Sequence, residues 1–289
     1  MKPILVIGAT GDVGREVVFQ LVAAGTPVRA MTRNPDGAGL PPQVEMVRAD
    51  LSRPGTLDAC LDGAESVFLI WSAPPDAAVP ALGRITHRAR RVVFVSSPYK
   101  TAHPFFQQPN PVRKLHAQIE QAIEASGVEW TFIRPGMFAA NALAWWAPQI
   151  RSGNIVRWPY ASACTAPIHE RDMAAVAVRC LCDDGHGGAE YVLTGPESLS
   201  QTEQVATIGR AIGRSLDMEE ISPEEAYREL NMPAPVVEML LSAWAAATGQ
   251  PALVTSTVSE ITGRPARTFF EWAVENAGTF RVSATCRRA

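Results

Sequence analysis

The feature that most constrains this chain is a glycine-rich turn between a predicted strand and a predicted helix. An apolar run over residues 3–7 leads into Gly8-Ala-Thr-Gly11-Asp-Val-Gly14, and apolar residues then recur at helical spacing over residues 13–24. In this context the first glycine permits a tight turn, the second lets the backbone approach a pyrophosphate, and the third lets helix and strand pack closely. Backbone amides at the start of the helix face the phosphates. The sequence therefore predicts a dinucleotide site, against the alternative of a glycine turn that binds nothing.

Strands and helices alternate through the first half of the chain. The further predicted strands are residues 27–32, 44–48, 66–71, 91–96 and 130–134. The helices predicted between them are residues 56–61 and 112–126. This alternation predicts an α/β fold with a doubly wound parallel sheet of the Rossmann type, which binds ligands at the carboxyl ends of its strands.

The pattern loosens after about residue 140, and the length of 289 residues fits two unequal lobes. We expect residues 1–155 to form the dinucleotide-binding Rossmann domain and residues 156–289 a smaller, mainly helical substrate-binding lobe, with chain exchange between the two. The helices predicted in the second part are residues 172–182, 200–213, 223–230, 235–247 and 268–276.

Composition and charge exclude several classes of protein. There are 26 Lys and Arg against 29 Asp and Glu, which gives a net charge of −3. No run of basic residues is long enough to bind along the phosphate backbone of a nucleic acid, so nucleic acid is not expected as a partner. The first apolar run, residues 4–7, is too short for a signal peptide or a membrane span, which predicts a cytoplasmic protein without a membrane partner. The cysteines are odd in number and lack zinc-like spacing, so we interpret them as reduced thiols and expect no metal. They are Cys60, Cys164, Cys180, Cys182 and Cys286.

The residue after the second predicted strand indicates which dinucleotide is bound. A protein that prefers NAD usually places an acid there to accept hydrogen bonds from the ribose hydroxyls. Arg33 instead offers a guanidinium group suited to a 2′-phosphate, which predicts NADP(H), although a solvated loop arginine is the alternative. Asp50 and Leu51 follow the third strand and are predicted beside the adenine; alternatively, Asp50 caps the next turn.

The chain resembles the NmrA-like branch of the atypical short-chain dehydrogenases/reductases along nearly its whole length. The motifs are Gly8-Ala-Thr-Gly-Asp-Val-Gly14, Arg33, Val93-Phe-Val-Ser-Ser97, His116-Ala-Gln-Ile-Glu120, Ser126-Gly127, Thr131-Phe-Ile-Arg-Pro-Gly136, Asn141 and Leu193-Thr-Gly-Pro196. Together with the glycine turn, the resemblance implies a cofactor site lined by Gly8, Thr10, Gly11, Asp12, Val13, Gly14, Arg33, Asp50, Leu51, Ser72, Ala73, Pro135, Gly136, Met137 and Phe138.

The chain departs from its relatives at the catalytic helix. Relatives with a standard dehydrogenase site carry Tyr-x-x-x-Lys there, followed by a glutamate four residues on. Counting back from Glu120 places His116 at the lysine position and Val112 at the tyrosine position, so the tyrosine that donates the proton is missing. Tyr99 and Lys100 lie nearby in sequence, but adjacent residues cannot replace a pair one helical turn apart.

The remaining candidates follow from the resemblance. Ser96 and Ser97 are expected to bond a substrate carbonyl, or else to satisfy backbone groups at the strand end. His116 is a candidate proton donor or ribose ligand, or a buried histidine bonded to backbone. Asp172 is expected to cap a helix. The expected substrate contacts, with core packing as the alternative for the tryptophans, are Tyr99, Trp145, Trp146 and Trp158.

Two functions fit these residues. The first is an NADPH-dependent reductase of a ketone or quinone on a bulky aromatic, polyketide-like molecule, as in antibiotic biosynthesis, with hydride transfer promoted mainly by positioning. The second, favoured by the missing tyrosine, is a non-enzymatic NADP(H)-binding redox sensor of the NmrA type. An isomerase is a third alternative, and the oligomeric state stays open.

Overall fold

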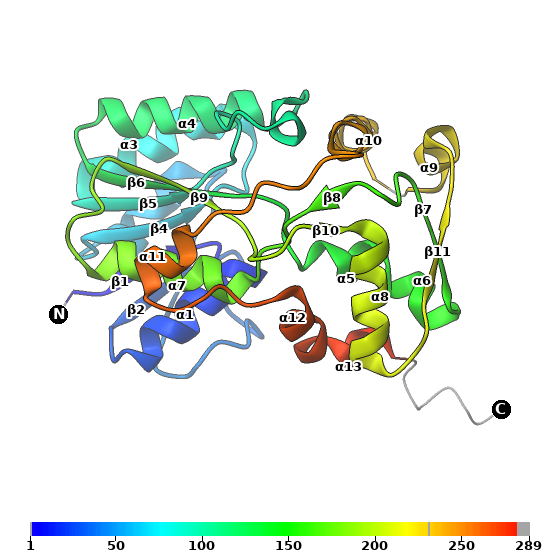
Figure 1. The fold of residues 1–289 in the computed structure, drawn as a ribbon. Helices are drawn as coiled ribbons and strands as arrows, with labels where there is room; N and C mark the ends of the chain where they lie inside the picture. Colours follow the sequence, from blue (N-terminus) through cyan, green and yellow to red (C-terminus); the bar gives the residue numbers. More distant parts are fainter. Residues whose placement is uncertain (1, 231, 282–289) are drawn as a thin grey trace.

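The computed structural model describes residues 2–230 and 232–281, which form two lobes (Figure 1). The larger lobe is built on a parallel sheet of seven strands in the order β3-β2-β1-β4-β5-β6-β9. Their bounds are β1 Ile4–Ile7, β2 Val28–Thr32, β3 Glu45–Arg48, β4 Ser66–Ile70, β5 Arg91–Val95, β6 Glu129–Pro135 and β9 Ala189–Leu193. The chain runs outward from β1 in both directions, so the predicted doubly wound Rossmann sheet is confirmed.

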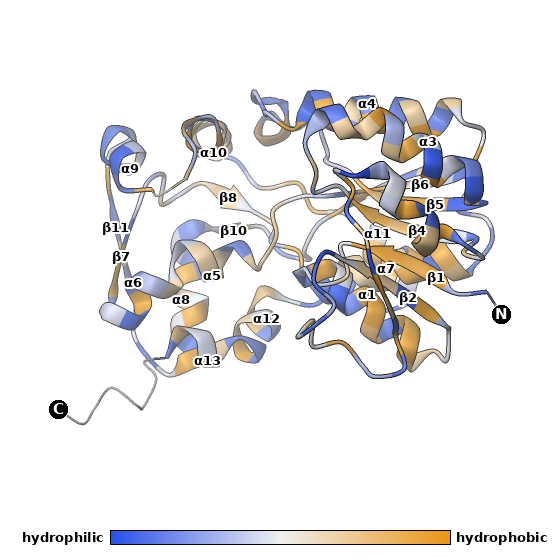
Figure 2. Cartoon of the chain, turned by 180° about the vertical axis from the view of Figure 1, so that it is seen from behind, coloured by the Kyte–Doolittle hydropathy of each residue, from blue (hydrophilic) through white to orange (hydrophobic). Residues whose placement is uncertain are grey.

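Helices cover both faces of this sheet. One face carries α1 Asp12–Ala23, α7 Glu170–Cys182 and α11 Thr257–Thr262, and the other carries α2 Asp58–Leu61, α3 Ala78–Arg88 and α4 Arg113–Ala125. Because both faces are covered, the central strands β1, β4 and β5 are mostly apolar and buried, whereas the edge strand β3 is partly exposed. Figure 2 shows the middle of the sheet mainly in the hydrophobic colour. Short 3₁₀ turns lie in the connections between these elements: η1 Pro54–Leu57, η2 Pro75–Ala77 and η3 Pro104–Gln107.

The sequence did not predict α3. Its buried residues Ala78, Ala81, Leu82 and Ile85 follow the helical period, but Pro80 interrupts the pattern. The proline lies in the first turn, where a backbone N–H has no partner inside the helix, so it does not break α3.

The smaller lobe is mainly helical, as predicted. Its helices are α5 Asn141–Trp145, α6 Ala147–Ser152, α8 Gln201–Ile212, α9 Pro223–Glu229, α10 Ala234–Ala247, α12 Phe269–Glu275 and α13 Ala277–Phe280. Two unpredicted strand pairs join them: β7 Ile155–Trp158 with β11 Asp217–Glu220, and β8 Cys164–Thr165 with β10 Leu199–Ser200. Capping boxes at Ser200 and Thr268 explain the sharp starts of α8 and α12.

After residue 156 the chain crosses between the two lobes more than once. Helix α7, strand β9 and helix α11 all return to the sheet of the larger lobe, although they lie in the part of the chain assigned to the second lobe (Figure 1). The boundary between residues 155 and 156 stays a prediction.

Other sequence-based expectations concern cysteines, metals and membranes. Burial raises the pKa of the Cys60 thiol to about 11 and that of Cys180 to about 12, while Cys286 lies outside the described residues. Within residues 2–230 and 232–281 no three potential metal-binding side chains gather at one point. The same part of the chain holds no helix whose length and hydropathy would let it cross a bilayer.

Candidate active site

The glycine-rich turn has the geometry that a bound pyrophosphate requires. Gly8 has a φ of +90°, a conformation that favours glycine, and the Gly11 amide donates to the Gly8 carbonyl at 3.1 Å. A Cβ atom on Gly14 would lie 2.1 Å from the Gly8 carbonyl oxygen, so helix α1 needs a glycine there to pack on the turn. A Cβ atom on Gly11 would meet nothing closer than 3.6 Å. Gly11 therefore leaves open space where phosphates would approach.

A pocket of about 360 Å³ continues from this turn along the carboxyl ends of β1 and β2. Six of the predicted cofactor residues line it: Gly8, Thr10, Arg33, Asp50, Leu51 and Ser72. It is also lined by Arg15, Met31, Thr32, Asn34, Asp36, Gly37 and Ala38. Of the other predicted residues, Gly11, Asp12, Val13, Gly14 and Ala73 belong to the adjoining turns and helix but do not line the pocket. The lining residues fit the adenosine end of a dinucleotide.

Arg15 is a pocket residue that sequence reasoning missed. Its guanidinium group donates to the carbonyl oxygens of Gly39, at 2.9 Å, and Ala38, at 3.0 Å. These bonds join the start of α1 to the loop that follows Arg33, a loop that also carries Asp36 into the pocket. Its place directly after Gly14 was the available signal, since the first turn of α1 faces the phosphates.

Asp50 stabilises a turn and also lines the pocket where the adenine is expected. Its carboxylate accepts hydrogen bonds from the Ser52 amide at 2.9 Å and the Ser52 hydroxyl at 2.8 Å, which lower its pKa, so it stabilises the turn after β3. The same residue lines the nucleotide pocket.

A second cavity of about 320 Å³ lies between the two lobes. The 3₁₀ turn η3 Pro104–Gln107 and helix α10 contribute to it together with the ends of β5 and β6 and the start of α4. The predicted residues brought together in it are Ser96, Ser97, Tyr99, His116, Pro135, Gly136, Met137 and Phe138. Residues that were not predicted are Pro98, Phe105, Phe106, Gln108, Asn110, Asn141, Met239, Leu240 and Ala243. The lining, all within the described part of the chain, contains no Asp, Glu, Lys or Arg.

Two serines and a histidine lie in the polar part of this cavity, whose lining also includes the amide side chains of Gln108, Asn110 and Asn141. The Nδ1 atom of His116 lies 3.0 Å from the Ser97 Oγ, and its ring packs edge-on to Phe94. Burial, with a smaller contribution from the positive charge of Arg134, lowers the pKa of His116 to about 4. The Ser96 Oγ is buried and has no hydrogen-bond partner among the described residues. At neutral pH the site therefore holds a neutral imidazole and one unpaired hydroxyl.

Tyr99 does not replace the missing tyrosine. Its hydroxyl donates to Glu120 Oε2 at 2.5 Å, and the same oxygen accepts from Arg134 at 2.8 Å. Burial, then the hydrogen bond to Glu120 and the charge of that carboxylate, raise the pKa of Tyr99 to about 12. The Lys100 Nζ atom lies 2.8 Å from Glu190 and 3.7 Å from the same Glu120 oxygen. The Tyr99 ring is thus a wall of the cavity, and its proton is held on the side of Glu120.

The predicted tryptophans do not line the cavity. Trp146 and Trp158 are each 1% exposed, and Trp145 and Trp244 pack against Trp158 with ring centroids 5.7 and 5.4 Å away. The Trp158 indole donates to the Gln201 side chain at 2.7 Å. These rings form the core of the smaller lobe, so the structure places them in the packing role.

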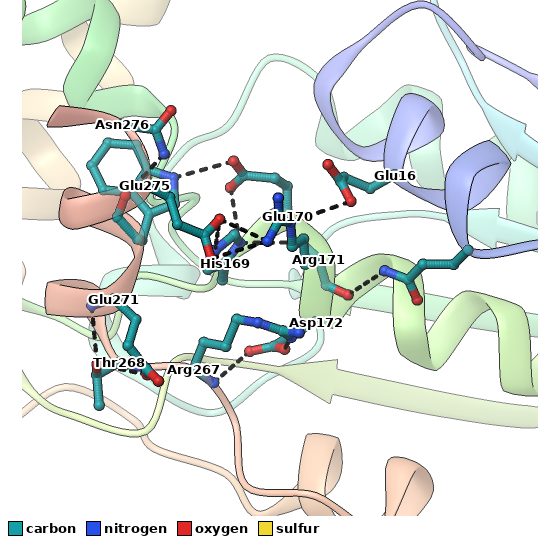
Figure 3. A network of polar contacts seen from close by, with 12 residues as sticks. Glu16, His169, Glu170, Arg171, Asp172, Arg267, Thr268, Glu271, Glu275 and Asn276 are labelled. Carbon is teal, nitrogen blue, oxygen red and sulfur yellow. Dashed lines mark hydrogen bonds and ion pairs between the residues drawn. The ribbon is translucent and has the colours of Figure 1, made fainter. Parts of the chain in front are cut away.

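The expectation for Asp172 was wrong in its detail. Helix α7 begins earlier, and its cap is His169, whose Nδ1 accepts from the Arg171 amide at 3.2 Å. Asp172 instead accepts from the backbone amide of Arg267, at 2.7 Å, and from its guanidinium group. Figure 3 shows these contacts together with the ion pairs from Arg171 to Glu16 and to Glu275. This network joins α1, α7 and the segment leading into α12.

Comparison with known proteins places this arrangement in a family. An NAD(P)H-binding family model matches residues 8–184, more than half of the chain. A reductase from Streptomyces griseus, (4-alkanoyl-5-oxo-2,5-dihydrofuran-3-yl)methyl phosphate reductase, is 41% identical over 292 residues, which cover 96% of this chain and 99% of the relative. This chain belongs to the NmrA-like NAD(P)H-binding family.

Other family members extend the comparison. The NAD(P)H azoreductase of Xenophilus azovorans is 34% identical, with 96% of this chain and 99% of the relative covered. The Escherichia coli NADPH-dependent quinone oxidoreductase, solved in complex with NADPH, superposes with a TM-score of 0.78 at 22% identity, covering 94% of this chain and 99% of the other. The predicted class, an NAD(P)H-binding oxidoreductase of the NmrA-like branch, is thereby confirmed.

Proposed function

We propose that this protein is an NADPH-dependent reductase whose substrate is a conjugated carbonyl compound, a quinone or an unsaturated ketone or lactone on a bulky ring system. One observation carries the proposal. The polar part of the inter-lobe cavity contains hydrogen-bonding groups but no ready acid, because His116 is neutral, Tyr99 is bound to Glu120, and Val112 stands at the tyrosine position.

Reduction of an isolated ketone leaves an alkoxide, which needs a proton donor beside it. In a conjugated acceptor the added electron pair is delocalised onto a carbonyl oxygen as an enolate or phenolate, and water can supply the proton afterwards. Such a reaction needs positioning more than acid catalysis. This difference favours a conjugated substrate over an isolated ketone.

NADPH, when bound, supplies the hydride. The glycine-rich turn and Arg33 would hold its phosphates, and the loop Pro135–Phe138 borders the cavity where the substrate would lie. The unpaired Ser96 hydroxyl is available to donate to a substrate oxygen, and His116 holds Ser97 in a fixed orientation.

The names of the relatives support the same class of substrate. These names refer to a quinone, an azo compound and a dihydrofuranylmethyl phosphate carrying oxo and alkanoyl groups, and each contains a conjugated acceptor. Each accepts two electrons without leaving an isolated alkoxide.

The test is an NADPH-oxidation assay with three compounds of similar size: a naphthoquinone, an unsaturated lactone and a saturated ketone. We expect turnover of at least one conjugated compound and a rate at least a hundredfold lower with the ketone. Tight NADPH binding without oxidation in the presence of any of the three would instead favour the redox sensor.

Variants of the polar residues test the mechanism. We expect His116→Ala and Ser96→Ala each to lower turnover by about tenfold to a hundredfold, because each removes orientation or one polar contact. A carbonyl compound with a neighbouring phenol should react faster than its methyl ether, since the phenol can supply the proton internally. A loss above about ten-thousandfold in His116→Ala, at unchanged cofactor affinity, would identify the histidine as the general acid.

A further inference from the structure

The end of the inter-lobe cavity between η3 and α10 is apolar. We call it the arm groove and define it by Phe105, Phe106, Met239, Leu240 and Ala243. It is continuous with the polar part of the same cavity, so one ligand can occupy both.

The η3 wall of the arm groove is held in place from several sides. His103 caps η3 by accepting from the Phe105 amide at 3.3 Å, and its Nε2 lies 3.2 Å from the Pro251 carbonyl oxygen in the segment after α10. The Phe105 and Phe106 rings pack edge to face at 5.1 Å. A Cβ atom on Gly136 would lie 3.4 Å from the Phe106 ring, so this ring rests directly on the loop that borders the reaction end. The wall is therefore formed before a ligand binds.

The α10 wall supplies apolar surface that the protein itself does not fully cover. Met239 is half-buried and supplies most of this surface, whereas Leu240 and Ala243 are buried, each 6% exposed, and line the cavity beside it. An apolar group placed there leaves water at little conformational cost, because the walls are already packed. A charged group would lose its hydration without gaining a partner, since the cavity lining holds no charged side chain.

We propose that the substrate carries an uncharged, apolar arm that lies in the arm groove while its reducible ring faces Ser96 and His116. This proposal rests on the proposed function. It adds that the enzyme selects among conjugated acceptors by the length and polarity of one substituent.

The first experiment uses 1,4-naphthoquinones with a straight 2-alkyl chain from methyl to hexyl. Each methylene buried in the groove should raise kcat/KM by about threefold to fourfold until the groove is filled. A hexanoate chain ending in a carboxylate should lower kcat/KM at least tenfold relative to the hexyl compound. The proposal would be overturned if kcat/KM did not change with chain length, or if the carboxylate compound had the same kcat/KM as the hexyl compound.

The two proposals fail in different ways. Turnover of the methyl compound tests whether the protein is a reductase. The dependence of kcat/KM on chain length tests whether an apolar substituent binds in the arm groove. If no quinone is turned over, the dissociation constants of the same series, measured by quenching of tryptophan fluorescence, still decide whether the arm contributes to binding.

Variants on both walls locate the effect. Met239→Trp should fill the groove and lower the hexyl-to-methyl ratio of kcat/KM at least tenfold, and Phe106→Ala should flatten the chain-length dependence from the other side. Glu238→Trp is the matched control, because residue 238 is exposed on the same helix and does not line the cavity. Thermal melting of each variant separates misfolding from loss of selectivity, and an unchanged ratio in both folded groove variants would contradict the proposal.

Discussion

At the scale of residues, the side chains expected to select the nucleotide lie around the pocket beside the first glycine-rich turn. Arg33 lines the nucleotide pocket as an exposed cation, and Arg15 fixes the loop that carries Asp36 into the same pocket. A carboxylate so close to an expected phosphate makes the position of that loop important, because like charges repel at short range.

We expect Arg33→Ala to remove most of the preference for NADPH over NADH, a loss of about tenfold to a hundredfold, since a charge-assisted hydrogen bond contributes roughly 1.5–3 kcal/mol. Arg15→Ala should reduce the preference about tenfold by releasing the loop. The measurement is kcat/KM for both cofactors, with Arg84→Ala, in an exposed ion pair with Asp58, as control. Equal affinity of the unmodified protein for both cofactors would refute the role of Arg33.

The glycines of the first turn differ in what they support. Gly11→Val should abolish cofactor binding and leave the melting temperature nearly unchanged, because its backbone is extended and the space around it is open. Gly14→Ala should instead destabilise the fold, since its Cβ atom would collide with the Gly8 carbonyl. Calorimetry with NADPH, together with melting curves, distinguishes the two. Normal binding by Gly11→Val would place the dinucleotide elsewhere.

At the scale of helices and strands, α7 is connected to the smaller lobe by the buried carboxylate of Asp172. We expect Asp172→Ala to lower the free energy of unfolding by about 2 kcal/mol, because the Arg267 amide and guanidinium group lose their acceptor. Arg179→Ala is the control, since it breaks only an exposed pair with Asp183 on the same helix and should cost less than about 0.5 kcal/mol. Urea unfolding measures both, and equal effects would contradict the assigned role.

Local patterns made some elements and site residues predictable. The glycine turn, the first helix and Arg33 all lie within 33 consecutive positions, and helices were also predicted over residues 200–213 and 268–276, where α8 and α12 lie. Strand β9 was missed because its pairing with β6 joins distant segments, and only Leu193 among its residues is fully buried. The arm groove was missed for the same reason: Phe106 and Met239 come together only through the packing of η3 on α10.

At the scale of the whole molecule, two buried histidines make stability depend on pH. Burial lowers the pKa of both His116 and His169 to about 4, against 6.5 in an unfolded chain. Between these values the unfolded state binds protons that the folded state does not, so the free energy of unfolding falls as the pH drops from about 6.5 to 4. Urea unfolding at pH 7, 6 and 5 measures this fall.

The variant His169→Asn isolates one of the two contributions. Asparagine can still cap α7 but does not titrate, so the fall in stability should be smaller than in the unmodified protein. Parallel curves for the two proteins would show that His169 is not the titrating group.

The return of α7 and β9 to the sheet also determines when that sheet can be completed. A ribosome that has released residues 1–155 has made β1 to β6, but neither the strand that pairs with the edge of β6 nor the helix that lies beside α1. Until residue 193 emerges, the nascent chain presents an open strand edge and an uncovered apolar face, both of which favour aggregation. The nucleotide-binding lobe is therefore finished only after part of the smaller lobe has been synthesised, and a fragment ending at residue 155 would retain the nucleotide motif without a closed core around it.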